Sequence, residues 1–135
     1  MKDSVIEKRV LVLEDNESNA ELIRFYLEEM GYRVKIISEG GLLFRAIADF
    51  KPDLVTIDIE LPDANGIELF RQMQSNPDLQ SVPVVFITVQ ESASEGGIAL
   101  GARGFLSKPF SDSDLQQVVQ QALQLGSAPQ KGDIK

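Results

Sequence analysis

Polar side chains follow several short apolar runs of the chain, and their types suit phosphoryl chemistry. Glu14 and Asp15 come directly after one run, Asp58 after another, and Thr88 ends a third. Lys108 follows a fourth, weaker run. Carboxylates are the ligands that hard cations such as Mg²⁺ prefer, and a carboxylate beside such a cation can attack a phosphoryl group. If the fold gathers these residues, the sequence predicts phosphoryl transfer to an aspartate.

Each of these residues has a distinct expected role. Asp58 is the nucleophile and would form an aspartyl phosphate. Lys108 would pair with a phosphoryl oxygen and the Thr88 hydroxyl would donate to another, while Mg²⁺ would neutralise the remaining charge. Taken singly, such residues are more often helix caps, turn residues or solvent-facing charges. Their joint arrangement at strand ends favours the site.

Composition removes several other classes of function. The chain has no Cys and no His, which excludes disulfides, thiolate nucleophiles, zinc–thiolate sites and imidazole-based triads. Neither the P-loop spacing nor GxGxxG occurs. A formal charge of −8, from 13 basic and 21 acidic residues, argues against nucleic-acid binding by this chain. With a charged start and no long apolar stretch, we expect no membrane contact and a cytoplasmic location.

The elements that must position these residues follow from the apolar pattern. Continuous apolar runs at 10–13, 54–57 and 84–87 are typical of strands buried on both faces, and weaker runs at 34–37 and 104–107 indicate edge strands. Between these runs, apolar residues recur at helical spacing in four segments. The first is capped by Asn16 or Ser18 and ends at Gly31. The others cover 42–50, the residues after Gly66, and Ser111 to Gly126. The segment 92–100, with two adjacent glycines, is a weak helix.

This alternation predicts a doubly wound α/β fold. A chain of 135 residues makes one domain, with a parallel five-stranded sheet covered by helices on both faces. We expect a lead-in at 1–8, the folded domain at 9–125 and a flexible tail or linker at 126–135. In such sheets the ligand site lies beyond the carboxyl ends of the strands, where adjacent strands are about 4.8 Å apart. The polar residues above all follow those ends.

Four motifs together resemble the receiver domain of bacterial two-component response regulators. They are VLVLEDN at 10–16, DLVTIDIELPDANG at 53–66, VVFIT at 84–88 and GARGFLSKPF at 101–110. The resemblance covers about residues 8–124. It implies a flavodoxin-like, three-layer sandwich with strand order 2-1-3-4-5.

The resemblance also implies how the site works. Asp58 would accept phosphate from a phosphohistidine of a sensor histidine kinase or a histidine phosphotransfer protein. Glu14 and Asp15 match the acidic pair that holds Mg²⁺ or Mn²⁺, with Asp58 and the backbone carbonyl of Glu60 as further ligands. Such a chain is a signalling phosphoacceptor rather than an enzyme, and catalyses only its own phosphorylation and dephosphorylation.

Further residues match the switch of the family. Thr88 and Phe105 correspond to its coupled hydroxyl and aromatic ring, and Lys108 to its phosphate-pairing lysine, whose bond to Pro109 is cis in relatives. One position departs from the pattern: Val89 stands where relatives carry a smaller residue, and its bulk is expected to restrict access to Asp58. Glu14 in place of the commoner Asp is a milder change, because its longer arm still reaches a metal.

Relatives bind their targets through the last two helices and the fifth strand. The outer side of the last helix carries a row of glutamines, at 116, 117, 120, 121 and 124, which is a candidate contact surface for a downstream protein or a homodimer. An ordinary solvated face is the simpler reading of that row. The kinase, the stimulus and the target are not encoded in any motif of the chain.

Three alternatives stay open at this point. The chain is a free-standing regulator or a receiver cut from a hybrid histidine kinase or a multidomain regulator. A pseudo-receiver, which binds partners without phosphorylation, is less favoured because no acidic residue or lysine of the site is lost. The third alternative is a phosphohydrolase of the haloacid dehalogenase type. That class has Asp two residues after its nucleophile, whereas this chain has Glu60, which argues against it.

Overall fold

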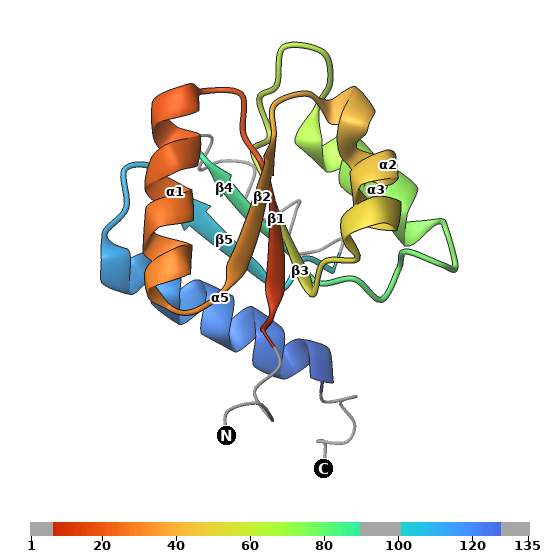
Figure 1. The fold of residues 1–135 in the computed structure, drawn as a ribbon. Coiled ribbons are helices and arrows are strands. Elements are labelled where there is room, and N and C mark those ends of the chain that lie inside the picture. The colour runs from red at the N-terminus through yellow and green to blue at the C-terminus, as the bar shows by residue number, and fades with distance from the viewer. Residues whose placement is uncertain (1–6, 90–100, 128–135) are drawn as a thin grey trace.

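A five-stranded parallel sheet forms the centre of the molecule (Figure 1). The computed structural model describes residues 7–89 and 101–127. Within these ranges the strands are β1 (Arg9–Leu13), β2 (Arg33–Ile37), β3 (Leu54–Ile57), β4 (Val84–Thr88) and β5 (Gly104–Ser107). Their order, β2-β1-β3-β4-β5, confirms the predicted topology and puts the two weaker runs at the edges.

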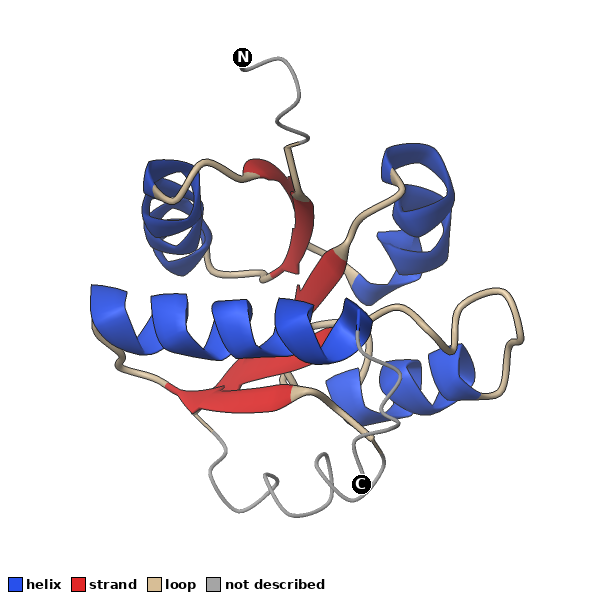
Figure 2. Cartoon of the chain, turned by 90° about the horizontal axis from the view of Figure 1, so that it is seen from below, coloured by secondary structure: helices blue, strands red, loops and turns tan. Residues whose placement is uncertain are grey.

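Helices cover both faces of this sheet (Figures 1 and 2). Among the described residues they are α1 (Glu17–Glu29), α2 (Leu43–Phe50), α3 (Gly66–Gln74) and α5 (Asp112–Ser127). Helices α1 and α5 lie on one face, and α2 and α3 on the other. The predicted three-layer α/β sandwich is therefore confirmed. None of the described helices is long and apolar enough to cross a membrane.

Two helix boundaries differ from the sequence prediction. A 3-10 turn, η2 (Gly40–Leu42), precedes α2, and α5 continues through Gly126 to Ser127. The 3-10 turn arises where the chain packs closely on the loop after β3: a Cβ on Gly40 would lie 2.7 Å from the Cβ of Ala64. The predicted helix at 92–100 lies outside the described residues.

Side chains cap the helices next to the carboxyl edge of the sheet. Asn16, rather than Ser18, caps α1, because its Oδ1 accepts a hydrogen bond of 2.9 Å from the N–H of Asn19. Ser111 and Asp114 form the predicted capping box of α5, each side chain accepting from the other's backbone N–H at 3.1 and 3.2 Å. These caps fix where the loops leave the strands.

The sheet separates two apolar clusters. Alternate residues of β1 point to opposite faces: Leu11 and Leu13 join the cluster beneath α2 and α3, and Val10 and Val12 join the cluster beneath α1 and α5. We call these the α2–α3 core and the α1–α5 core. With both faces covered, the carboxyl edge is where the strands deliver polar side chains.

Candidate functional site

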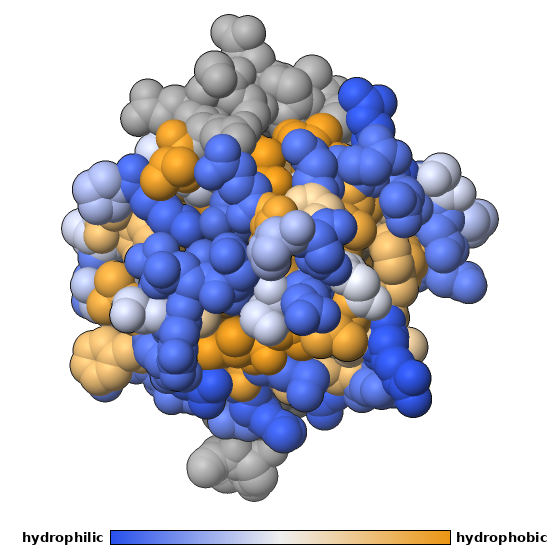
Figure 3. All heavy atoms as spheres, turned by 90° about the horizontal axis from the view of Figure 1, so that it is seen from above, coloured by the Kyte–Doolittle hydropathy of each residue, from blue (hydrophilic) through white to orange (hydrophobic). Residues whose placement is uncertain are grey.

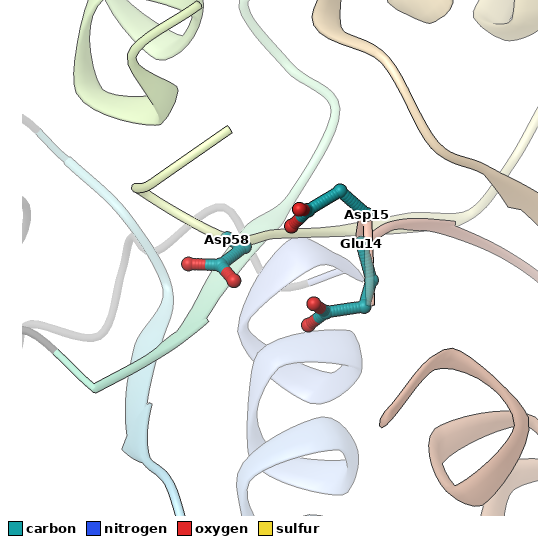
Figure 4. A group of neighbouring side chains, drawn as sticks. All are labelled: Glu14, Asp15 and Asp58. Carbon is teal, nitrogen blue, oxygen red and sulfur yellow. The ribbon is translucent and has the colours of Figure 1, made fainter. Parts of the chain in front are cut away.

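The ends of β1 and β3 bring three carboxylates together. The strands are paired in parallel with Leu13 opposite Ile57, and the N–H of Asp58 donates to the carbonyl of Leu13 at 3.1 Å. One carboxylate oxygen from each of Glu14, Asp15 and Asp58 lies within 4.8 Å of the others. Figure 4 shows Glu14 and Asp15 extending from the end of β1 toward Asp58.

Lys108 reaches this cluster from the end of β5. Thr88 and Ser107 are partners in the β4–β5 register, and the N–H of Lys108 donates to the carbonyl of Thr88 at 2.9 Å. From there the Lys108 Nζ lies 2.8 Å from Oδ2 of Asp58 and 2.7 Å from Oε1 of Glu14. The amine thus forms ion pairs with two of the three carboxylates.

The cluster is buried on one side and open on the other. Glu14 is 2% exposed and Asp58 6%, whereas Asp15 is exposed. Figure 3 shows the molecule from above, looking at the carboxyl edge of the sheet. Hydrophilic residues lie across the middle of this face, with hydrophobic residues among them. The site therefore has an inner part held within the protein and an outer carboxylate that meets solvent.

Burial and charge shift two pKa values in the cluster. Burial raises the pKa of Glu14 above its usual value, although Lys108 and the N–H of Asn16 act against it. For Lys108, burial alone lowers the pKa, but the hydrogen bonds and charges of Asp58 and Glu14 outweigh it and raise the pKa overall. The ammonium is therefore held charged against the two buried carboxylates.

The loop between β3 and α3 holds the second oxygen of Asp58. The N–H of Glu60 donates to Oδ1 of Asp58 at 3.1 Å, so Lys108 and Glu60 together occupy both carboxylate oxygens. Asn65, which caps α3 through the N–H groups of Ile67 and Glu68, forms a bridge with Glu60. The Glu60 peptide is thereby fixed next to Asp58.

The residues expected to form the switch lie on β4 and β5. Thr88 is fully buried at the end of β4, and Val89 after it is 59% exposed. Phe105 is half-buried, opposite Phe86 in the β4–β5 register, and packs against the α2–α3 core. The Lys108–Pro109 peptide bond is cis. The structure thus brings Glu14, Asp15, Asp58 and Lys108 together, whereas Phe105 lies further down its strand; its switching role stays a prediction.

Two contacts near the site were not predicted from the sequence. One is the N–H of Glu60 on Asp58, and the other is a pair of hydrogen bonds from Gly40 and Gly41 to Asp63. The only sequence signal for them is LPDANG, a turn-forming stretch with Pro, Asp, Asn and Gly after the strand. That signal indicates a turn but not its partners.

The donors in the cluster fit a hard divalent cation. All are oxygens, one carboxylate is open to solvent, and the three lie close enough to share one ion. Lys108 neutralises only part of their charge. The donor set therefore suits Mg²⁺ far better than zinc, which prefers nitrogen and sulfur.

Fold and site together define a flavodoxin-like α/β domain with a carboxylate–lysine site at its carboxyl edge. Residues 10–120 match the family model of the response regulator receiver domain, and the chain belongs to this family. Receiver domains are signalling modules of two-component systems, in which response regulators receive phosphoryl groups from sensor kinases.

Known proteins agree with this assignment. The chain is 33% identical over 117 residues to the phosphate regulon transcriptional regulatory protein PhoB of Rhizobium meliloti, an alignment that covers 85% of the chain and 52% of that protein. The chain spans about half the length of the regulators it matches in this way.

Solved structures show the same fold. A putative response regulator from Chloroflexus aurantiacus superposes with a TM-score of 0.83 at 27% identity, covering 88% of this chain and 99% of that one. The receiver domain of a sensor histidine kinase from Pseudomonas aeruginosa superposes with a TM-score of 0.79 at 26% identity and with the same coverage. That structure has a magnesium ion coordinated in its active site cleft.

Proposed function

We propose that this chain is the phosphoacceptor of a two-component phosphorelay. Asp58 takes a phosphoryl group from a phosphohistidine of a sensor histidine kinase or a histidine phosphotransfer protein. The observation that carries the proposal is the contact of the Lys108 ammonium with both Asp58 and Glu14, 2.8 and 2.7 Å away, at the edge of a receiver fold. An ion pair that only stabilised the fold would need no further carboxylate. Here a third carboxylate, that of Asp15, lies beside the pair.

The acidic cluster would hold Mg²⁺ or Mn²⁺. Its ligands are the carboxylates of Glu14, Asp15 and Asp58 and the backbone carbonyl of Glu60. The ion, when bound, supplies positive charge that neutralises the oxygens of the phosphoryl group. The magnesium ion in the active site cleft of the Pseudomonas aeruginosa receiver domain supports this assignment.

Transfer proceeds by in-line displacement at phosphorus. A carboxylate oxygen of Asp58 forms a bond to phosphorus while the bond from phosphorus to the imidazole nitrogen breaks, and that nitrogen keeps the electron pair. The Lys108 ammonium, which pairs with Asp58 before transfer, then pairs with a phosphoryl oxygen. The Thr88 hydroxyl donates to another phosphoryl oxygen. The same groups serve dephosphorylation, in which water attacks phosphorus.

Phosphorylation would change a surface that binds a target protein. The added group brings about two negative charges and three acceptor oxygens. Movement of Thr88 toward it, with Phe105 turning inward, would couple the site to β5 and the last two helices. Four of the five glutamines on α5 are exposed, as a contact surface requires; Gln116 is half-buried. The predicted helix at 92–100, which would form part of this surface, lies outside the described residues.

Labelling with a small phosphodonor tests the proposal. Incubation with Mg²⁺ and acetyl phosphate or phosphoramidate is expected to give an acid-labile phosphate on the chain. Asp58→Asn should abolish the label, whereas Asp78→Asn, at an exposed position in the loop after α3, should keep it. Absence of any label on the wild-type chain would contradict phosphorylation and favour a pseudo-receiver.

A further inference from the structure

Asp63 joins two loops at the carboxyl edge of the sheet. Its Oδ1 accepts a hydrogen bond of 2.8 Å from the N–H of Gly40, and its Oδ2 accepts one of 2.9 Å from the N–H of Gly41. Both oxygens of a single carboxylate are thus bound to consecutive amides, 23 and 22 positions away. Asp63 is not a member of the acidic cluster of Glu14, Asp15 and Asp58.

The two loops are built to meet at this point. Gly40 is buried, and a Cβ there would lie 2.7 Å from the Cβ of Ala64 and 2.9 Å from Cδ1 of Leu69. Only glycine allows so close an approach. The hydrogen bonds of Asp63 therefore belong to a tight contact between η2 and the loop before α3, rather than to a chance encounter of surface groups.

Asp63 lies at the tip of a short turn whose base carries the Glu60 peptide. The N–H of Leu61 donates to the carbonyl of Ala64 at 3.3 Å, and Glu60 forms a bridge with Asn65. At the base, the Glu60 N–H donates to Oδ1 of Asp58. Fixing the tip of so short a turn also fixes its base, so restraint at Asp63 is transmitted to the phosphoacceptor.

We propose that Asp63 is a positioning residue for the phosphoacceptor site. By holding the 61–64 turn against Gly40 and Gly41, it keeps the Glu60 peptide in place, with its N–H on Asp58 and its carbonyl as the expected metal ligand. This inference rests on the proposed function. It differs from a purely structural role, in which the same bonds would only stabilise the start of α2.

Asp63→Ala, with Asp53→Ala as its matched control, tests the inference. Asp53 also accepts a backbone N–H across the chain, from Arg9 at 2.8 Å, but at the opposite end of β3. Mg²⁺ affinity is measured by calorimetry, stability by urea unfolding, and exchange of the Glu60 amide by NMR without metal. Loss of a group that orients a metal ligand weakens metal binding about 10- to 100-fold.

We expect Asp63→Ala to weaken Mg²⁺ binding about tenfold and to speed exchange of the Glu60 amide, with slower labelling of Asp58. Asp53→Ala should lower stability but leave both site readouts unchanged. Asp63→Asn keeps one carbonyl oxygen as an acceptor and should give intermediate values. Intact Mg²⁺ affinity and Glu60 exchange in Asp63→Ala, with only stability reduced, would overturn the positioning role.

Failure of the proposed function would look different. In that case the wild-type chain itself would neither bind Mg²⁺ nor take a label. The exchange of the Glu60 amide, which needs neither metal nor phosphodonor, would still decide whether Asp63 positions this peptide.

Discussion

Lys108 Nζ lies 2.8 Å from Oδ2 of Asp58, although the two residues are 50 positions apart in the chain. The same ammonium lies 2.7 Å from Glu14, so one cation is shared by two buried carboxylates. Because the side chain of Lys108 is only 11% exposed, this pairing takes place largely out of water. The stability of the site therefore depends on this one amine when no metal ion is bound.

Replacing Lys108 with Met should destabilise the metal-free protein. Removing one partner of a buried ion pair leaves uncompensated charge, at a cost of about 3 kcal/mol in the free energy of unfolding. Added Mg²⁺ is expected to recover more stability in Lys108→Met than in the wild type, because the cation replaces the lost positive charge. Urea unfolding with and without Mg²⁺ measures both effects. An equal gain from Mg²⁺ in the two proteins would contradict this account.

Gly66→Ala should damage both α3 and the phosphoacceptor. A Cβ at this position would lie 2.5 Å from the backbone oxygen of Asp58 and 2.8 Å from the Cα of Ile59, and backbone cannot move aside cheaply. We expect a loss of about 2 kcal/mol in stability. Gly41→Ala is the control, since its Cβ would meet Asp63 Oδ2 at 3.4 Å. Similar urea midpoints for the two variants would argue against the predicted clash.

The hydrogen bonds to Asp63 predict a specific pH dependence. The N–H groups of Gly40 and Gly41 hold the pKa of Asp63 below its usual value. At acid pH, Asp63 is then protonated to a smaller extent in the folded chain than in the unfolded chain. The resulting stability is present above the ordinary pKa of Asp63 and is lost as pH falls through its lowered value.

The difference in unfolding free energy between the wild type and Asp63→Ala should therefore shrink as pH falls through this window. Urea unfolding at a series of acid pH values measures it, with Asp78→Ala as an exposed control. A difference that stays constant with pH would show that the charge of Asp63 contributes nothing.

Val89→Ala should speed labelling of Asp58 several-fold. Val89 is 59% exposed next to Thr88, where its side chain is expected to obstruct the approach of the phosphodonor. Rates with acetyl phosphate, followed by acid-labile label, test this, and Mg²⁺ affinity should not change. Leu42→Ala removes another exposed apolar side chain, 45% exposed in η2, and should leave the rate unaltered. An unchanged labelling rate in Val89→Ala would show that Val89 does not restrict the approach of the phosphodonor to Asp58.

Much of the fold was predictable from local patterns. Strands covered on both faces appear as continuous apolar runs, and the helices of the two faces show stripes with caps at Asn16 and Ser111. The strand order came from the family resemblance, because apolar runs alone do not say which strands are neighbours. The 3-10 turn before α2 was not predicted, and the packing of its Gly40 against Ala64, 24 positions away, is a contact that local patterns do not show.

The proximity of the acidic residues and Lys108 was predictable, but the burial of each was not. The sequence indicates that Glu14 and Asp15 form an acidic pair, yet only the structure separates a buried Glu14 from an exposed Asp15. Both residues follow the end of β1, so the burial of each depends on the course of the loop and not on the alternation of a strand. The hydrogen bonds of Glu60 and Asp63 involve backbone amides, which every residue carries, so residue types gave no indication of them.

The division of the apolar interior by the sheet has a thermodynamic consequence. Ile23, in the α1–α5 core, and Met73, in the α2–α3 core, belong to different clusters on opposite faces. Changes at such positions are expected to be additive in free energy, because the two clusters have no residue in common. Substitutions in one core therefore need no compensating substitutions in the other. The packing of one helical layer can change while that of the other layer stays the same.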